Sequence, residues 1–255
     1  MSARGVAVAL DGVRRRYGDH EVLAGIDLAV RPGELLAIVG QSGQGKSVLL
    51  RQIVGLERPD AGHIVVGDMP LERYLALPAG KKPFRIAMVF QGAALLASLT
   101  VADNVALRLR EHHQVPRAEI AGRVHGALAQ VELAGSESKL PGELSGGMRK
   151  RAAIARALAI DPELILYDEP TADLDPLLTE QIGGLIARIR ATRGSTQIIV
   201  THNLALAAAI ADRIAVLDGG RIVESLPPAA LASSRHPLTR ELLRAAGIGG
   251  SHAQL

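Results

Sequence analysis

The sequence predicts an α/β fold in which a helical segment is inserted into an α/β core that has an antiparallel β region at its front. Three observations support this fold. Short β-rich runs separated by turn residues fill the first third of the 255-residue chain. From Gln91 to about Leu158 helical periodicity replaces them. Beyond that point strands and helices alternate, which is typical of a parallel α/β sheet.

The first third is expected to contain short strands joined by turns. The expected strands are 5–10, 21–30, 34–39, 63–66 and 85–90, with turns at 17–19 and 31–33. The run at 34–39 is almost uniformly apolar, as expected for a strand that is covered on both faces. A glycine-rich loop and a helix at 46–56 follow this buried strand.

The inserted segment and the last third account for the remaining elements. Amphipathic helices are expected at 101–113 and 117–132, and a third helix at 148–158. The alternation that follows is strand 164–167, helix 177–190, strand 197–200, helix 204–211 and strand 213–217. We therefore expect one domain over 1–226, with the helical subdomain at about 92–158. Residues 227–255 are expected to form a short helical tail that Pro237 breaks.

Composition excludes several classes of protein. With 48% hydrophobic and 22% charged residues, the chain is not intrinsically disordered. A net charge of +3 is too small for a protein that coats nucleic acid, so no nucleic-acid partner is expected. The absence of cysteine excludes disulfides, thiol nucleophiles and cysteine-based zinc sites. No run approaches the ~18 apolar residues of a membrane span, and no signal peptide is evident, so any membrane role would require a partner.

A phosphate-binding loop is predicted at 40–47, where the sequence fits G-x-x-x-x-G-K-[ST] between an apolar strand and a helix. Backbone N–H groups and the helix N-terminus would bind the phosphates. Lys46 would reach the β- and γ-phosphates, and the Ser47 hydroxyl would ligate Mg²⁺. A glycine-rich turn without a nucleotide is the much weaker alternative. The residues expected to contact nucleotide are Gly40, Gln41, Ser42, Gly43, Gln44, Gly45, Lys46, Ser47 and Val48.

Two carboxylates follow the apolar run at 164–167. Asp168 is placed to hold Mg²⁺, directly or through water. Glu169 comes one residue later, where it could orient and deprotonate an attacking water molecule. Such a pair is usually part of a solvated loop, but a phosphate loop earlier in the chain makes it informative. The two features together predict a P-loop NTPase core.

A second turn able to bind anions is predicted at Ser145-Gly146-Gly147, where a helix begins. An ordinary helix cap is the alternative, since serine is a favoured N-cap residue. One nucleotide does not need two such helix ends from a single chain. The second helix end therefore suggests a site that is shared with a neighbouring subunit.

These motifs, in this order, resemble the ATP-binding cassette (ABC) family from about residue 6 to residue 223. The loop at 40–47 resembles the Walker A motif, 164–169 the Walker B motif and 144–148 the family signature. Gln91 resembles the Q-loop glutamine, and the segment 172–175, with Asp175, resembles the D-loop. His202 resembles the switch histidine. Tyr17 resembles the aromatic residue that stacks on adenine. Without this resemblance Tyr17 could be only a turn aromatic, and His202 only a capping residue.

The resemblance implies a head-to-tail homodimer that holds two ATP molecules with Mg²⁺ at its interface. Ser145 and Gly147 would contact the γ-phosphate of an ATP bound by the other subunit. Glu169 would be the general base, and His202 would contact the γ-phosphate and hold the water in line. Gln91 would sense the metal and the water. By contrast, His112 and His113, and the run 14–16, are expected to be solvated.

The resemblance also implies a partner. Such an ATPase drives a separate permease and lies peripherally at the cytoplasmic side of the inner membrane. The apolar segment Gln91–Leu99 is the expected contact surface, although its leucines could instead belong to the core of the helical subdomain.

Within the family, several stretches resemble the ATPases of Mla/Mce-type lipid transporters, which also use an MCE-domain protein. These stretches are 45–50, 90–96, 100–105, 107–112, 144–153 and 167–176. Two features differ. Asp173 stands where the family more often has glycine, and 236–243 resembles the tails of oligopeptide importer ATPases. Uptake of a solute delivered by a binding protein, or an ATP-driven regulator that moves no substrate, therefore remain as alternatives.

Overall fold

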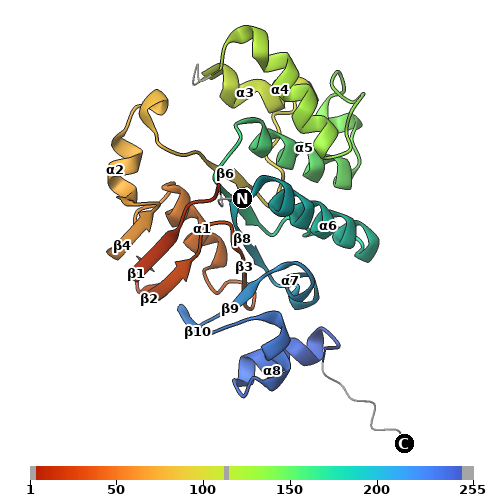
Figure 1. Cartoon of the computed structure of the whole chain (residues 1–255). Helices are drawn as coiled ribbons and strands as arrows, with labels where there is room; N and C mark the ends of the chain where they lie inside the picture. Colours follow the sequence, from red (N-terminus) through yellow and green to blue (C-terminus); the bar gives the residue numbers. More distant parts are fainter. Residues whose placement is uncertain (1–3, 112–114, 249–255) are drawn as a thin grey trace, which may run out of the picture.

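The computed structural model describes residues 4–111 and 115–248, and it contains two sheets surrounded by helices (Figure 1). An antiparallel sheet has the order β2-β1-β4-β5. Its strands are β1 (Val8–Tyr17), β2 (His20–Val30), β4 (Ala61–Val66) and β5 (Met69–Pro70). The second sheet has the order β10-β9-β3-β8-β7-β6. Its strands are β3 (Leu35–Val39), β6 (Ile86–Val89), β7 (Leu164–Asp168), β8 (Thr196–Thr201), β9 (Arg213–Asp218) and β10 (Arg221–Leu226).

The second sheet is parallel except at one edge. Strands β3, β6, β7, β8 and β9 run in the same direction, whereas β10 pairs with β9 antiparallel. The α-helices are α1 (Lys46–Val54), α2 (Leu71–Ala76), α3 (Val101–Glu111), α4 (Arg117–Gln130), α5 (Gly146–Ala159), α6 (Pro176–Arg193), α7 (Leu204–Ile210) and α8 (Pro237–Ala245). The predicted α/β class, with its antiparallel β subdomain and inserted helical subdomain, is confirmed.

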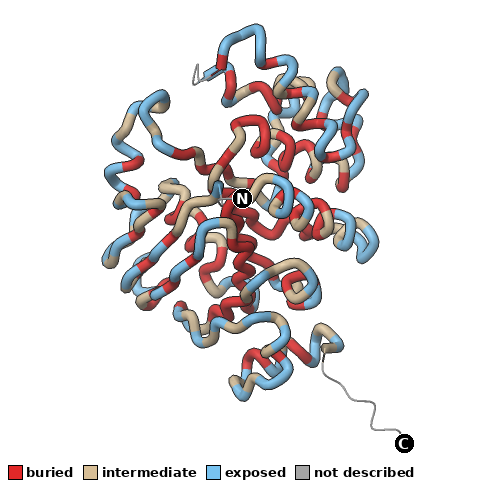
Figure 2. Tube along the Cα trace, in the orientation of Figure 1, coloured by how far each residue is buried: buried red, intermediate tan, exposed pale blue. Residues whose placement is uncertain are grey.

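The parallel sheet separates two hydrophobic cores. Alternate residues of β3 point to opposite faces, so Leu36 and Ile38 pack with the antiparallel sheet and α1. Leu35, Ala37 and Val39 pack on the other face, with α5 to α7. All of β3 is buried, and buried segments follow the centre of the sheet in Figure 2. Burial on both faces explains why this strand is uniformly apolar in sequence.

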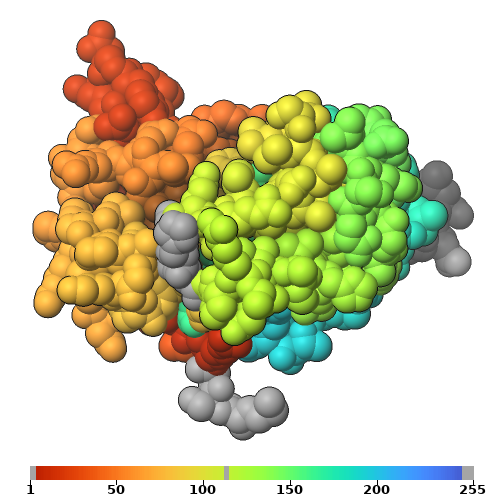
Figure 3. Space-filling model, turned by 90° about the horizontal axis from the view of Figure 1, so that it is seen from above, coloured from red at the N-terminus to blue at the C-terminus, as the bar shows by residue number. Residues whose placement is uncertain are grey.

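Helices α3, α4 and α5 form the inserted subdomain, which lies on one side of the molecule (Figure 1). Viewed from above, it forms a continuous surface coloured yellow to green (Figure 3). Helix α5 begins at Gly146, two residues before the predicted start, because Ser145 is the N-cap and its Oγ accepts a hydrogen bond from the Met148 N–H.

Several elements differ from the prediction. Strand β1 continues to Tyr17 rather than ending at residue 10, because it forms a long bulged hairpin with β2. Pro237 begins α8 instead of breaking a helix, as suits a residue without an N–H at the first helical position. Strands β5 and β10 and helix α2 were not predicted. His112 and His113 lie outside the described residues.

The C-terminal segment packs onto the rest of the molecule. Leu238 and Leu243 of α8 are buried and belong to the same core cluster as α5 to α7. The division of the chain into a domain at 1–226 and a tail at 227–255 stays a prediction. In the described part of the chain, no helix combines the length and apolar character that crossing a membrane requires.

Candidate nucleotide-binding and hydrolysis site

The carboxyl ends of neighbouring parallel strands bring the predicted site residues together. In the sheet, β8 lies between β3 and β7, and β6 lies beside β7. The phosphate loop follows β3, Asp168 ends β7 and His202 follows β8. Because these strands are parallel, the segments that follow them meet at one edge of the sheet, where ligands bind in such folds.

Two glycines of the phosphate loop are required by the surrounding structure. A Cβ atom on Gly40 would lie 2.5 Å from the Leu217 carbonyl oxygen, which belongs to the backbone of β9. Gly45 has φ 90° and precedes α1, and a Cβ there would lie 2.8 Å from Val22. Glycine therefore lets the loop fold tightly against β2 and β9 while α1 begins beneath it.

Lys46 is held inside this loop. Its Nζ donates hydrogen bonds of 2.8 Å to the carbonyl oxygens of Gly40 and Gln41, and it lies 3.8 Å from Glu169 Oε1. Burial lowers the pKa of Lys46, while the carboxylates of Glu169 and Asp168 act to raise it. The structure therefore positions a cation between the loop and the two carboxylates.

Ser47 and Asp168 form a pair of oxygen donors that fits a magnesium ion. The Ser47 Oγ donates a hydrogen bond of 2.7 Å to Asp168 Oδ1. Mg²⁺ in nucleotide sites takes one or two protein oxygens and completes its octahedron with water and phosphate oxygens. The described residues hold no cluster of three or more His, Cys, Asp or Glu side chains. The donor set therefore suits Mg²⁺ shared with a nucleotide better than a metal held by the protein alone.

The carboxylate of Glu169 lies between the Lys46 ammonium group and His202. Its Oε2 is 3.0 Å from His202 Nδ1, and the main-chain N–H of His202 donates a hydrogen bond of 3.3 Å to the same oxygen. Its own N–H donates to the Val200 carbonyl of β8 at 3.0 Å. Glu169 adopts φ 43°, a left-handed conformation that costs free energy in a residue other than glycine. The surrounding structure thus maintains a strained backbone in order to place this carboxylate.

A cavity of about 660 Å³ lies beside the phosphate loop and is lined by residues from several of these segments. The predicted residues among those lining it are Ser42, Gly43, Gly45, Lys46, Ser47, Val48, Gln91, Glu169 and His202. His20, Val22, Ala172 and Asp173 also line it. His20 and Val22 are residues of β2, and no sequence motif marks them. Ala172 and Asp173 belong to the segment 172–175 that resembles the D-loop, and the sequence predicts that Asp173 adds a negative charge beside the site.

The backbone of Asp173 adopts a conformation that favours glycine. Its φ is 64°, in the left-handed region that glycine adopts without strain and that aspartate tolerates better than most residues. This chain therefore keeps the shape of the turn but adds a carboxylate to the wall of the cavity.

Two other predicted residues, Tyr17 and Gln41, are not among the described residues that line the cavity. Tyr17 is 43% exposed, its hydroxyl donates to Glu57, and the Arg15 guanidinium lies 4.7 Å from its ring centre. Gln41 Nε2 donates to Glu241 of α8 at 3.4 Å. The stacking of Tyr17 on adenine stays a prediction.

The remaining predicted positions cap helices or support loops. Asp175 accepts a hydrogen bond of 2.9 Å from the Leu178 N–H and caps α6. Gln44 accepts one of 3.1 Å from the Gly219 N–H. Ser145 and Gly146 cap and begin α5, and a Cβ on Gly147 would lie 3.2 Å from Leu178. The signature turn is thus folded as a helix N-terminus away from the cavity of its own subunit.

Comparisons with known proteins identify the family. Residues 23–172 match the family model described as ABC transporter. The chain is 38% identical over 245 residues to the probable ribonucleotide transport ATP-binding protein mkl of Mycobacterium tuberculosis strain H37Rv, covering 96% of this chain and 68% of that protein. It is 41% identical over 243 residues to the L-cystine transport system ATP-binding protein TcyN of Escherichia coli K12, covering 93% and 97%.

A solved structure extends this similarity to three dimensions. The ATP-binding cassette MJ0796, described as a dimeric post-hydrolysis state bound to ADP and Pi, has a TM-score of 0.76 at 31% identity over 87% of this chain and 98% of that one. The names of the similar proteins describe ribonucleotide and cystine transport, so they support the predicted family without singling out lipid transport. Together with the geometry of the phosphate loop and its carboxylates, these similarities establish that the chain belongs to the ABC transporter family, as an ATP-binding subunit that hydrolyses ATP with Mg²⁺.

Proposed function

We propose that this subunit hydrolyses ATP at the interface of a head-to-tail homodimer and thereby powers a separate permease that imports a small solute. The observation that carries the import proposal is the 41% identity to a cystine transport ATPase over nearly the full length of both chains. The other steps rest on the geometry of the site.

For hydrolysis, Glu169 is proposed as the general base. Its carboxylate borders the cavity, and His202 Nδ1 lies 3.0 Å from it, so the imidazole can orient the carboxylate or a water molecule beside it. Lys46 and the N-terminus of α1 would hold the β- and γ-phosphates. Ser47, Asp168 and Gln91 would hold the Mg²⁺, which would neutralise charge on the phosphates.

For the dimer, the exposed signature turn is proposed as the trans contact. Ser145 is exposed at the start of α5, Gly146 is half-buried, and Gly147 is buried near Leu178. Backbone N–H groups in the first turn of a helix have no intrahelical partner, so this end of α5 can receive an anion. A γ-phosphate bound in the partner subunit would meet this end of the helix. Asp175, beside it at the start of α6, is proposed to contact the same interface.

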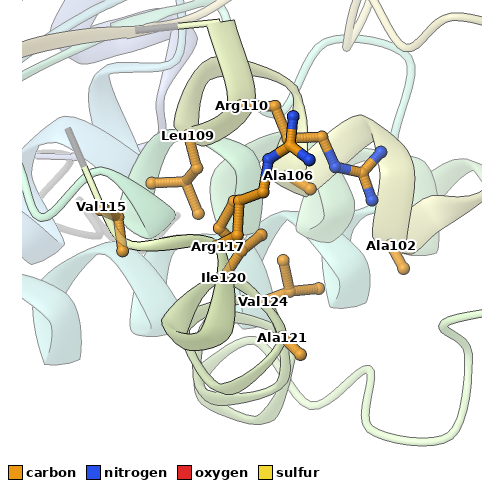
Figure 4. Close-up of a pocket in the computed structure, with 9 residues that line it drawn as sticks. All are labelled: Ala102, Ala106, Leu109, Arg110, Val115, Arg117, Ile120, Ala121 and Val124. Carbon is orange, nitrogen blue, oxygen red and sulfur yellow. The ribbon is translucent and has the colours of Figure 1, made fainter. Parts of the chain in front are cut away.

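For the permease, the proposed contact surface is the segment Gln91–Leu99 with the adjoining helical subdomain. Ala93 is buried and Leu95 packs against the core, as the alternative interpretation of this segment expected, but Leu96 is 47% exposed. Between α3 and α4 lies a cavity of about 480 Å³ whose wall is mostly apolar (Figure 4). Arg110 and Arg117 also line it, so a permease helix with an acidic residue would complement it. This contact would place the chain peripherally at the cytoplasmic side of the inner membrane.

A second substrate class is favoured by a different observation. The stretches 90–96 and 144–153 resemble lipid-transport ATPases of the Mla/Mce type, so phospholipid transport with an MCE-domain partner is the other candidate. Both candidates use the same ATP-hydrolysing dimer and differ only in the partner proteins.

The test is to tag the chain in its source cell, extract the complex in mild detergent, and identify proteins and lipids by mass spectrometry. A permease with a solute-binding protein, and uptake of that solute lost in a Glu169→Gln strain, is the result we expect. A permease with an MCE-domain protein and phospholipid would replace import by lipid transport. Absence of any permease would instead indicate a regulator that moves no substrate.

A further inference from the structure

A buried lysine joins the signature helix to the loop that carries Gln91. Lys150 of α5 is 8% exposed, and its Nζ donates a hydrogen bond to the main-chain carbonyl oxygen of Gln91. Arg156 of the same helix donates to the carbonyl oxygens of Ala93 and Ala94, at 2.9 and 2.5 Å. One helix thus supplies three hydrogen bonds to the backbone of a single short loop.

The loop needs this support because its backbone is strained. Ala93 and Ala94 have φ values of 62° and 49°, which are unfavourable for residues with a Cβ atom. The hydrogen bonds from Lys150 and Arg156 offset this cost. As a result, the position of Gln91 beside the cavity depends on side chains of α5, five and eleven residues after Ser145.

We infer that Lys150 is a positioning residue of the ATPase reaction, which holds the main chain of Gln91 against the signature helix. The inference rests on the proposed role of Gln91 beside the Mg²⁺ and the γ-phosphate in this cavity.

A substitution series tests this inference with the purified full-length chain. The variants are Lys150→Met, which removes the hydrogen-bond donor, and Lys150→Arg, which keeps one. The matched control is Lys139→Met, since Lys139 is an exposed lysine of the same subdomain. For each protein, kcat and KM for ATP hydrolysis, the Kd for ATP and the melting temperature are measured.

We expect Lys150→Met to lower kcat by about tenfold or more while the Kd for ATP changes by less than about threefold, because the phosphate loop is untouched. Lys150→Arg should keep most of the rate, because a guanidinium can still donate a hydrogen bond to the carbonyl oxygen of Gln91. Lys139→Met should behave as the wild type.

Three results would overturn the inference: an unchanged kcat in Lys150→Met, a rate in Lys150→Arg as low as that in Lys150→Met, or a loss of rate that only follows a lower melting temperature. If Lys150→Met does not fold, Lys150→Leu takes its place, since it also removes the hydrogen-bond donor. Failure of this inference is distinguishable from failure of the proposed site, because the wild type and Glu169→Gln report on hydrolysis at the site without any change at Lys150.

Discussion

The Oε2 atom of Glu169 lies 3.0 Å from Nδ1 of His202, although the two residues belong to segments that follow different strands. This contact forms because β7 and β8 are parallel neighbours whose carboxyl ends lie at the same edge of the sheet. It places the proposed base and the group that would orient it on the same wall of the cavity.

Replacing Glu169 with glutamine is expected to abolish steady-state hydrolysis while leaving ATP binding intact, because the amide cannot accept a proton but fills the same space. The ATP-bound dimer should then accumulate, which size-exclusion chromatography with light scattering would detect. Loss of a general base should reduce kcat by about 10²-fold or more. The control is Glu119→Gln, at an exposed position of α4. Normal turnover in Glu169→Gln would contradict the role of Glu169.

Replacing Ser145 with arginine should abolish hydrolysis with little change in the affinity of the monomer for ATP. Ser145 is exposed and lies outside the described lining of its own subunit's cavity, so a long side chain there would obstruct only a partner subunit. ATP affinity can be measured by isothermal titration calorimetry at a concentration that favours monomers. An equal loss of binding and hydrolysis would mean that the signature turn acts within its own subunit.

The substitution Gly40→Ala should weaken ATP binding by about tenfold or more and lower stability, because its Cβ would overlap the Leu217 carbonyl oxygen, a backbone atom that cannot move aside easily. Gly80→Ala is the matched control, since a Cβ there has no neighbour within 4 Å in the described structure. Thermal melting and ATP titration of both variants would check this. Equal behaviour of the two variants would show that the loop can shift away from β9.

Stability should decrease in acid partly through Glu34. Burial raises the pKa of Glu34, but hydrogen bonds from Arg213 and from the Arg31 N–H outweigh burial, so the folded-state pKa lies below 4.5. The stabilisation is therefore present above the unfolded-state pKa and is lost as pH falls through the folded-state pKa. Denaturant unfolding measured across this pH range should show a smaller acid loss for Glu34→Gln, by about 1 kcal/mol. An identical pH profile for both proteins would contradict this assignment.

Features whose physical cause is local can be recognised in the amino-acid sequence alone. The phosphate loop is recognisable because glycines, a lysine and a serine must occur at set spacings between a strand and a helix, and β3 is recognisable because burial on both faces requires an unbroken apolar run. The carboxylates at Asp168 and Glu169 and the cap at Ser145 are local in the same sense.

Contacts between residues that are distant in the sequence depend on how the elements pack. His20 and Val22 reach the cavity because the β1–β2 hairpin folds over the phosphate loop, and no pattern within β2 signals this. The contact of Lys150 with the Gln91 carbonyl depends on how α5 packs, since a lysine on a helix otherwise looks like a solvated charge. Strand β10 was not predicted, because it is an edge strand with no fully buried residue and its sequence therefore carries little apolar signal. Its pairing with β9 is what defines it as a strand.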